Sequence, residues 1–164
     1  MVQITQTHNA NKKILIYLFC TIVIVFMIIQ FINFNNEKKT NLEETISLEQ
    51  ANIMISKGET LYMSNCASCH GSQLEGKKNW TSGKDEDGQS LPPPLNGEGH
   101  SWHHSPDQLF QIIRYGFKIY NPNYQGKMQG NEILSDEDIW SILEYMKSVW
   151  PKKIRDQYKS LVKH

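Results

Sequence analysis

Two cysteines and a histidine stand close together in the segment Ser64–Gly76, which reads SNCASCHGSQLEG. Cys66 and Cys69 are three positions apart, and His70 follows the second cysteine directly. On a helical turn this spacing places both thiols along one edge of a flat ring, where they can form thioethers, while the imidazole turns onto a metal at the ring's centre. The C-x-x-C-H pattern therefore predicts covalent attachment of one c-type haem, with His70 as an axial ligand of the iron.

Two other uses of paired cysteines fit the sequence less well. A structural zinc site needs four ligands, and the chain has three cysteines with no second Cys pair. A thioredoxin-like redox pair needs a βαβ context, whereas the flanks of Cys66 and Cys69 carry helical patterns. The third cysteine, Cys20, lies in an apolar run and is interpreted as a buried membrane residue rather than a ligand.

A cluster of histidines lies further along the chain, in the segment GHSWHHS. His100, His103 and His104 fall within five residues of one another and flank Trp102. Imidazole suits copper, so this cluster could be a copper site, or it could supply an alternative axial ligand. The remaining interpretation is a polar loop near the edge of the haem.

The element that precedes these motifs is an apolar run over residues Ile14–Ile32 without a charged residue. As a helix it spans about 28 Å, enough for a bilayer core. A cleaved signal peptide is the alternative, but the segment NFNNEKKT that follows offers no small-residue cleavage site. Phe19 also stands before Cys20 where a lipoprotein signal needs a small residue. We therefore expect residues 14–32 to be an uncleaved transmembrane anchor.

Charges beside the run favour a cytoplasmic N-terminal segment, residues 1–13. Lys12 and Lys13 directly precede the run, whereas Lys38 and Lys39 follow at a greater distance, beside Glu37. Haem is attached to c-type cytochromes outside the bacterial cytoplasm. Both arguments predict a single-pass protein of the bacterial inner membrane with its haem domain in the periplasm or on the outer face.

Helical patterns dominate the rest of the chain. Residues 33–46 are polar and predict a linker, and residues 47–150 predict one haem domain. A first helix is expected to begin near Ser47, where Ser47 and Gln50 match a capping box. A second is expected from Ser105 to Gly116, and a third from Ser135 to the helix-ending Pro151. With no alternating strand pattern, the fold class is predicted to be all-α.

Charge gives further guidance about partners. The chain has 17 basic and 17 acidic residues and a formal net charge of zero, which gives no case for nucleic-acid binding. The C-terminal tail, residues 151–164, is basic. It is interpreted as a solvated helix face, or as a surface that steers docking to an acidic redox partner or an anionic membrane.

Residues 47–150 resemble the class I, mono-haem cytochromes c. The resemblance rests on Gly58 and Tyr62 in the first helix, the CASCHG string, a Pro-Leu segment, a methionine and a final aromatic-rich helix. It implies a small all-α domain in which the first and last helices cross. Gly58 would permit their close approach, with Tyr62 and either Tyr145 or Trp140 packing nearby.

The same resemblance implies two more site residues. The family usually takes its sixth iron ligand from a methionine on a loop before the last helix, which corresponds to Met128. Many relatives carry Met-Pro there, whereas this chain has Met128-Gln129. A carbonyl of the Pro-Leu segment, here assigned to Pro94 in PPPLNG, is expected to accept the other N–H of His70.

The resemblance predicts an electron carrier rather than an enzyme, with one covalent haem c and His70 and Met128 as axial ligands. Expected partners are a donor dehydrogenase or complex, an acceptor oxidase and the membrane. Two alternatives remain open: a copper-handling or assembly factor that uses His100, His103 and His104, and a haem enzyme or sensor with an open sixth position.

Overall fold

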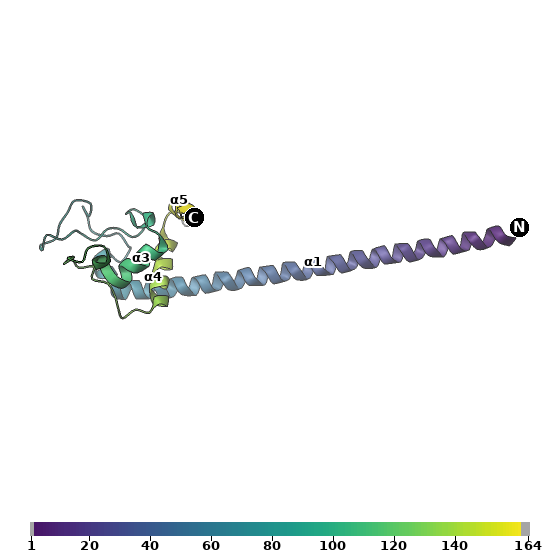
Figure 1. The fold of residues 1–164 in the computed structure, drawn as a ribbon, viewed down its shortest axis with the longest axis horizontal. Helices are drawn as coiled ribbons and strands as arrows, with labels where there is room; N and C mark the ends of the chain where they lie inside the picture. Colours follow the sequence, from purple (N-terminus) through teal and green to yellow (C-terminus); the bar gives the residue numbers. More distant parts are fainter. Residues whose placement is uncertain (1, 162–164) are drawn as a thin grey trace. The chain divides into compact units, whose positions relative to one another are not determined.

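The protein is helical throughout its regular structure (Figure 1). The computed structural model describes the backbone of residues 2–161 and the side chains of residues 15–160. The part of the chain that it describes contains an isolated β-bridge between Lys84 and Ser90 but no strand, so the predicted all-α fold class is confirmed. The helices in chain order are α1 (Val2–Asn65), α2 (Ala67–His70), η1 (Ser101–His103), α3 (Pro106–Tyr115), η2 (Gly116–Ile119), α4 (Asp136–Val149) and α5 (Lys152–Leu161).

Helix α1 contains the apolar run that the sequence assigned to the membrane. Within the described residues, α1 from Leu15 onward is the helix long and apolar enough to cross a bilayer. The chain divides into two compact units between Leu48 and Glu49. The first unit belongs to α1, and the second contains the end of α1 and every later element.

The prediction that a helix begins near Ser47 is wrong, because α1 passes through Ser47 without a break. Residues 33–46 contain neither glycine nor proline, the two residues that most often stop a helix, and the first glycine of the chain is Gly58. Their polar side chains continue it instead, and Lys39 pairs with Glu43 one turn later at 3.8 Å. The role of residues 33–46 as a linker stays a prediction.

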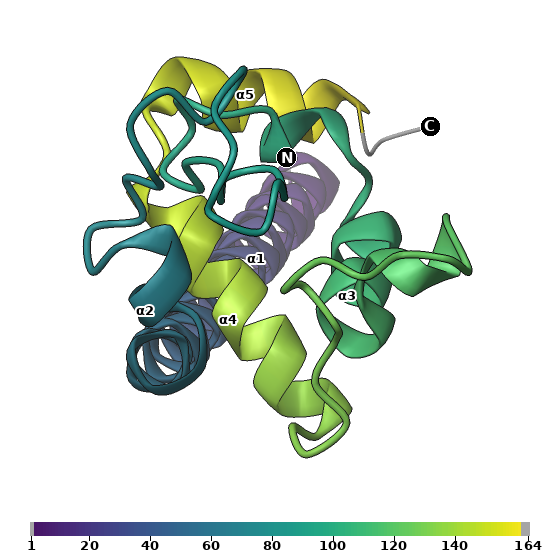
Figure 2. The same cartoon turned by 90° about the vertical axis from the view of Figure 1, so that its left-hand side faces the viewer.

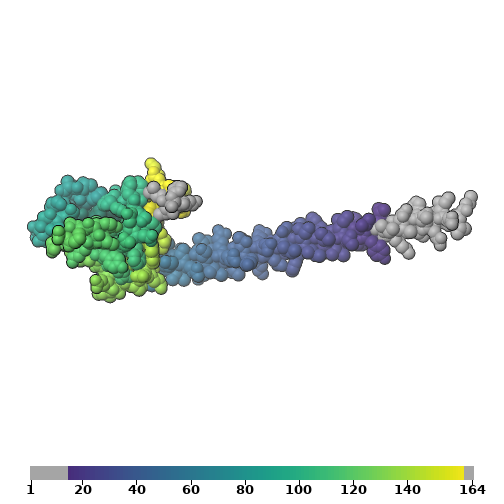
Figure 3. Space-filling view, viewed as in Figure 1, coloured from purple at the N-terminus to yellow at the C-terminus, as the bar shows by residue number. Residues whose placement is uncertain are grey.

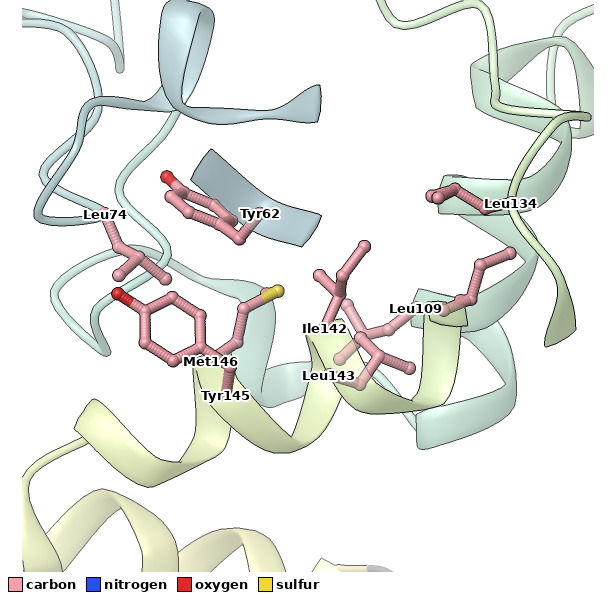
Figure 4. Packing of buried hydrophobic residues seen from close by; sticks show 9 residues of the cluster. Tyr62, Leu74, Leu109, Leu134, Ile142, Leu143, Tyr145 and Met146 are labelled. Carbon is pink, nitrogen blue, oxygen red and sulfur yellow. The ribbon is translucent and has the colours of Figure 1, made fainter. Parts of the chain in front are cut away.

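The core of the second unit lies where the end of α1 crosses α4 (Figure 2). Gly58 is buried there, and an added Cβ would overlap the carbonyl oxygen of Ser141. The predicted helix crossing at Gly58 is therefore confirmed, and the rings of Tyr62 and Tyr145 pack nearby with centroids 5.6 Å apart. The buried hydrophobic cluster consists of Tyr62, Leu74, Leu109, Leu134, Ile139, Ile142, Leu143, Tyr145 and Met146 (Figure 4).

The ends of α3 and α4 follow the signals in the sequence. Ser105 forms a capping box with Gln108 at the start of α3, and Gly116 is its C-cap. Ser135 forms a capping box with Asp138 at the start of α4. Trp150 ends that helix directly before Pro151, as predicted.

Most of the basic C-terminal tail forms helix α5. Its Tyr158 is buried and packs edge-on against Trp150, with ring centroids 5.1 Å apart. Arg155 donates hydrogen bonds to the carbonyls of Ser148 and Trp150, at 3.2 and 2.6 Å, so it satisfies groups at the end of α4. The tail is therefore partly a packed helix, and residues 162–164 lie outside the described residues.

Two irregular segments complete the second unit, and they carry Pro94, His100 and Met128 among the expected site residues. Residues 71–100 join α2 to η1, and residues 120–135 join η2 to α4. They account for much of the teal and green surface of this unit in Figure 3.

Candidate haem site

The three residues of the C-x-x-C-H motif share one helical turn. Cys66 directly precedes α2, and its carbonyl accepts hydrogen bonds from the backbone N–H of Cys69 at 3.1 Å and of His70 at 2.9 Å. Both cysteines are free thiols, Cys66 half-buried and Cys69 exposed. The turn thus gathers the two expected attachment points and the expected ligand, because residues three and four apart lie on one side of a helix.

The thiol of Cys66 is in its protonated form at neutral pH. Burial raises the pKa of Cys66 to about 11, and the neighbouring Cys69 adds to the effect. Redox-active and metal-bound cysteines show the opposite, a lowered pKa. Together with the helical flanks of Cys66, this environment argues against a thioredoxin-like redox pair.

His70 is held in one tautomer by a backbone carbonyl. Its Nδ1 lies 2.9 Å from the carbonyl oxygen of Pro93. Because a carbonyl can only accept, Nδ1 carries the hydrogen and Nε2 keeps its lone pair. Burial lowers the pKa of His70, against the opposing effect of the Pro93 carbonyl, so the ring is neutral at pH 7. A neutral imidazole fixed through one nitrogen is the form that binds metals through the other.

The acceptor of this hydrogen bond is Pro93, so its assignment to Pro94 was wrong. The three prolines have no N–H, and their carbonyls point to different partners. Pro92 accepts from the N–H of Lys77 at 2.9 Å. The Pro94 carbonyl faces Gly99, where an added Cβ would overlap it. The middle carbonyl is therefore the one aimed at His70, a direction that the sequence alone does not specify.

Gly76 is a site residue that the sequence reasoning missed. Its N–H donates to the carbonyl of His70 at 2.7 Å, and its φ of 68° lies in the left-handed region. An added Cβ would lie 2.5 Å from the carbonyl carbon of Pro93 and closer still to the nitrogen of Pro94. Only a residue without a Cβ lets the proline segment come this near. A lone glycine in LEGKK carries no signal for that role.

Further hydrogen bonds connect the motif to the core. The hydroxyl of Tyr62 donates to the carbonyl of Gly71 at 2.6 Å. The carbonyl of Leu74 accepts from the N–H of Leu95 at 2.7 Å, and the indole N–H of Trp150 donates to the carbonyl of Leu95 at 2.8 Å. The segment that holds His70 is therefore fixed to both α1 and the end of α4.

Met128 lies on the separate loop between η2 and α4, where it is half-buried. Its N–H donates to the hydroxyl of Tyr124 at 3.2 Å, and its carbonyl accepts from the N–H of Phe117 at 3.1 Å. Gly116 permits this contact, because an added Cβ there would overlap the Met128 carbonyl. The backbone of Met128 is thus held on both sides, while its role as an iron ligand stays a prediction.

The histidine cluster forms aromatic stacks rather than a metal centre. The ring of His100 stacks on Trp80 with centroids 5.6 Å apart and meets the ring of His104 edge-on at a centroid distance of 5.4 Å. The ring of His103 lies against Trp102 with centroids 3.7 Å apart. Among the residues whose side chains are described, no three His, Cys, Asp or Glu residues form a group that could hold a metal ion. The geometry therefore does not support the copper interpretation.

The chemistry of the donor set fits a c-type haem. Two free thiols on one turn can add to two vinyl groups, and a neutral imidazole with a free Nε2 can bind iron. Met128, whose backbone is held on the loop before α4, carries a thioether, which is another side-chain group that binds haem iron.

Comparisons with known proteins agree with this reading. A family model described as cytochrome C oxidase, cbb3-type, subunit III matches residues 54–146. The cbb3-type cytochrome c oxidase subunit FixP of Bradyrhizobium diazoefficiens is 28% identical over 97 residues, which cover 57% of this chain and 29% of FixP. The chain thus spans less than a third of the length of this relative, and no solved structure matches it. Since the family model covers more than half of the chain, including Cys66–His70, the protein belongs to the cytochrome c family of cbb3-type oxidase subunit III.

Proposed function

We propose that this protein is a membrane-anchored carrier of single electrons with one covalently bound haem. The observation that carries the proposal is the turn on which two free thiols adjoin an imidazole whose Nδ1 is held by the Pro93 carbonyl. Membership of a cytochrome c family supports the same conclusion.

Each residue of the turn has a separate role in this proposal. Cys66 and Cys69 hold the haem through thioethers, and His70 binds the iron through Nε2. The Pro93 carbonyl keeps the imidazole in one orientation and makes it a stronger donor. Gly76 allows the segment that carries that carbonyl to lie against the turn.

Met128 is proposed as the second axial ligand. The bound haem supplies an iron that alternates between Fe(II) and Fe(III). A thioether ligand raises the reduction potential by favouring Fe(II), and it keeps small molecules from the sixth position. The hydrogen bonds of Met128 to Tyr124 and Phe117 limit movement of the ligand loop, as a carrier that changes little between oxidation states requires.

The proposed setting is the electron-input side of a terminal oxidase. FixP is named as a subunit of a cbb3-type cytochrome c oxidase. By analogy, this chain would accept electrons from a membrane dehydrogenase or complex and pass them to an oxidase. Helix α1 would anchor it in the bacterial inner membrane, with the second unit in the periplasm or on the outer face.

The experiment that tests the proposal compares the detergent-solubilised holo-protein with its Met128→Ala variant. The oxidised wild type should show the weak far-red charge-transfer band of sulfur-ligated haem iron. Met128→Ala should lose that band, bind carbon monoxide readily and have a lower reduction potential, because the thioether no longer favours Fe(II).

Met63→Ala is the matched control, since Met63 is an exposed methionine of α1 close to the motif. It should keep the band and the potential. A wild type without the band, or a Met128→Ala variant that retains it, would show that Met128 is not the ligand. His100, His103 and His104 would then be tested in its place.

A further inference from the structure

Lys127, the residue before Met128, joins two loops that are far apart in the sequence. Its Nζ lies 2.7 Å from Oδ2 of Asp85 and 3.2 Å from Oδ2 of Asp87. The two acidic residues belong to the irregular segment after α2, and Lys127 belongs to the loop before α4. The teal and green regions that adjoin in Figure 3 contain these two segments.

Asp85, one of the two acidic partners of Lys127, is held in place by hydrogen bonds within its own turn. Oδ1 of Asp85 accepts hydrogen bonds from the backbone N–H of Asp87 at 3.0 Å and of Gln89 at 2.8 Å. The backbone N–H of Asp85 donates to the carbonyl of Gln89 at 2.9 Å, beside the bridge between Lys84 and Ser90. The carboxylate is therefore oriented with its second oxygen toward Lys127, and its side chain is 19% exposed.

This turn leads directly into the segment that holds His70. Ser90 closes the turn, and Pro93 follows three residues later with its carbonyl on Nδ1 of His70. On the other side of the ion pair, Lys127 directly precedes Met128 in the chain. The ion pair therefore connects the segment that fixes one proposed axial ligand to the loop that carries the other.

We infer that Lys127, together with Asp85 and Asp87, is a latch that keeps the Met128 loop closed over the haem. This inference rests on the proposed function, in which Met128 binds the iron. Lys127 is a positioning residue, because it acts on the iron through Met128. When the latch is absent, the loop opens more often, and an external ligand replaces Met128 faster.

The expected size of the effect follows from the exposure of the pair, in which the side chain of Lys127 is 63% exposed. Ion pairs of this kind contribute little, so the rate at which imidazole replaces Met128 should rise about two- to fivefold without the latch. Salt screens exposed charges. The wild-type rate should therefore rise with ionic strength toward that of a Lys127→Ala variant, whose own rate should change little.

The experiment uses the full-length holo-protein in detergent with four variants: Lys127→Ala, Lys127→Arg, Asp85→Asn with Asp87→Asn, and Lys118→Ala. Asparagine keeps the side-chain oxygen that accepts from the turn, so the double variant removes charge while the turn stays intact. Lys127→Arg keeps the charge and should behave like the wild type. Lys118 is an exposed lysine of η2, and its loss should have no effect.

Two readouts decide the outcome: the rate of imidazole binding, and amide hydrogen exchange over residues 120–130. Both should rise equally in Lys127→Ala and in the double Asn variant, and combining them should add nothing further. Wild-type values in Lys127→Ala, or independent and additive effects of the two changes, would overturn the latch.

The two proposals fail differently. If Met128→Ala loses the charge-transfer band while Lys127→Ala leaves both readouts unchanged, the electron-carrier proposal holds and the latch is wrong. If Met128→Ala keeps the band, Met128 is not the ligand and the proposed ligation fails. Hydrogen exchange over residues 120–130 then still shows whether Lys127 holds that loop.

Discussion

At the scale of single residues, Gly76 shows how closely the backbone must approach the proposed ligand His70. A Gly76→Ala variant places a Cβ against Pro93 and Pro94, so the proline segment must move away from the turn. We expect the hydrogen bond to His70 to weaken and the unfolding free energy of the holo-protein to fall by about 1–3 kcal/mol from the clash. Denaturant unfolding and the reduction potential measure the two effects.

Gly88→Ala is the matched control for this variant. Gly88 has a φ of 74°, close to the 68° of Gly76, but an added Cβ there meets no atom within 4 Å. Both variants carry the strain of a left-handed alanine, and only Gly76→Ala carries the clash. If the two variants lose the same stability and keep the same potential, Gly76 does not position the proline segment.

The residues of the motif could be predicted because their chemistry requires a fixed spacing. Cys66, Cys69 and His70 needed no knowledge of the fold, since one turn of helix brings them together. The direction of the Pro93 carbonyl depends instead on contacts of the two neighbouring prolines. Lys77 donates to the carbonyl of Pro92, and Gly99 lies against the carbonyl of Pro94. Such long-range contacts leave no local pattern, which is why the sequence pointed to the neighbouring proline.

At the scale of elements, an ion pair joins the start of α4 to α1. The Nζ of Lys57 lies 3.0 Å from Oδ1 of Asp138, whose other oxygen accepts from the N–H of Ser135 at 2.9 Å. Lys57 first, and then Ser135, lowers the pKa of Asp138 to about 2. A carboxyl with a lowered pKa stabilises the fold above its unfolded pKa, here 3.8, and this contribution is lost as the pH falls toward 2.

Asp138→Asn should therefore be less stable than the wild type at pH 5, and the difference should shrink as the pH falls from 4 to 2. Thermal unfolding of the holo-protein at pH 5, 4, 3 and 2 measures the difference. Glu132→Gln removes an exposed carboxyl from the loop before α4 and serves as the control. A difference between wild type and Asp138→Asn that stays constant down to pH 2 would contradict the assignment.

Helix ends were predictable where the side chain at the end makes the cap itself. Ser105 and Ser135 accept hydrogen bonds from residues three positions later, as their sequence contexts indicated. Ser47 shows the same local pattern but lies inside α1. The pattern starts no helix there, because a capping box forms only if the preceding residue leaves the helix. The sequence lacked any residue that would force the chain to do so.

At the scale of the whole molecule, the helix that carries the apolar run also contributes to the core of the haem domain. Residues 49–65 of α1 supply Gly58, Lys57 and Tyr62 to the second unit. The C-x-x-C-H motif begins directly after this helix ends at Asn65. One continuous helix therefore carries the apolar run, and the C-x-x-C-H turn follows the end of that helix, so insertion of the expected anchor and the proposed attachment of the haem can be tested together.

We expect residues 14–32 to remain on the protein as its anchor, and their insertion to be required for haem attachment outside the cytoplasm. Replacing Ile24 and Ile28 by Asp should cost about 2.5–3.5 kcal/mol per charge at the middle of the span. This variant should leave the membrane fraction and carry no haem on a denaturing gel. Leu42→Asp with Ile46→Asp has the same spacing outside the run and should retain both properties. A mature chain that begins after Ile32, found by mass analysis in a soluble periplasmic fraction, would rule out the anchor. Haem that separates from the denatured wild-type chain would rule out the thioethers.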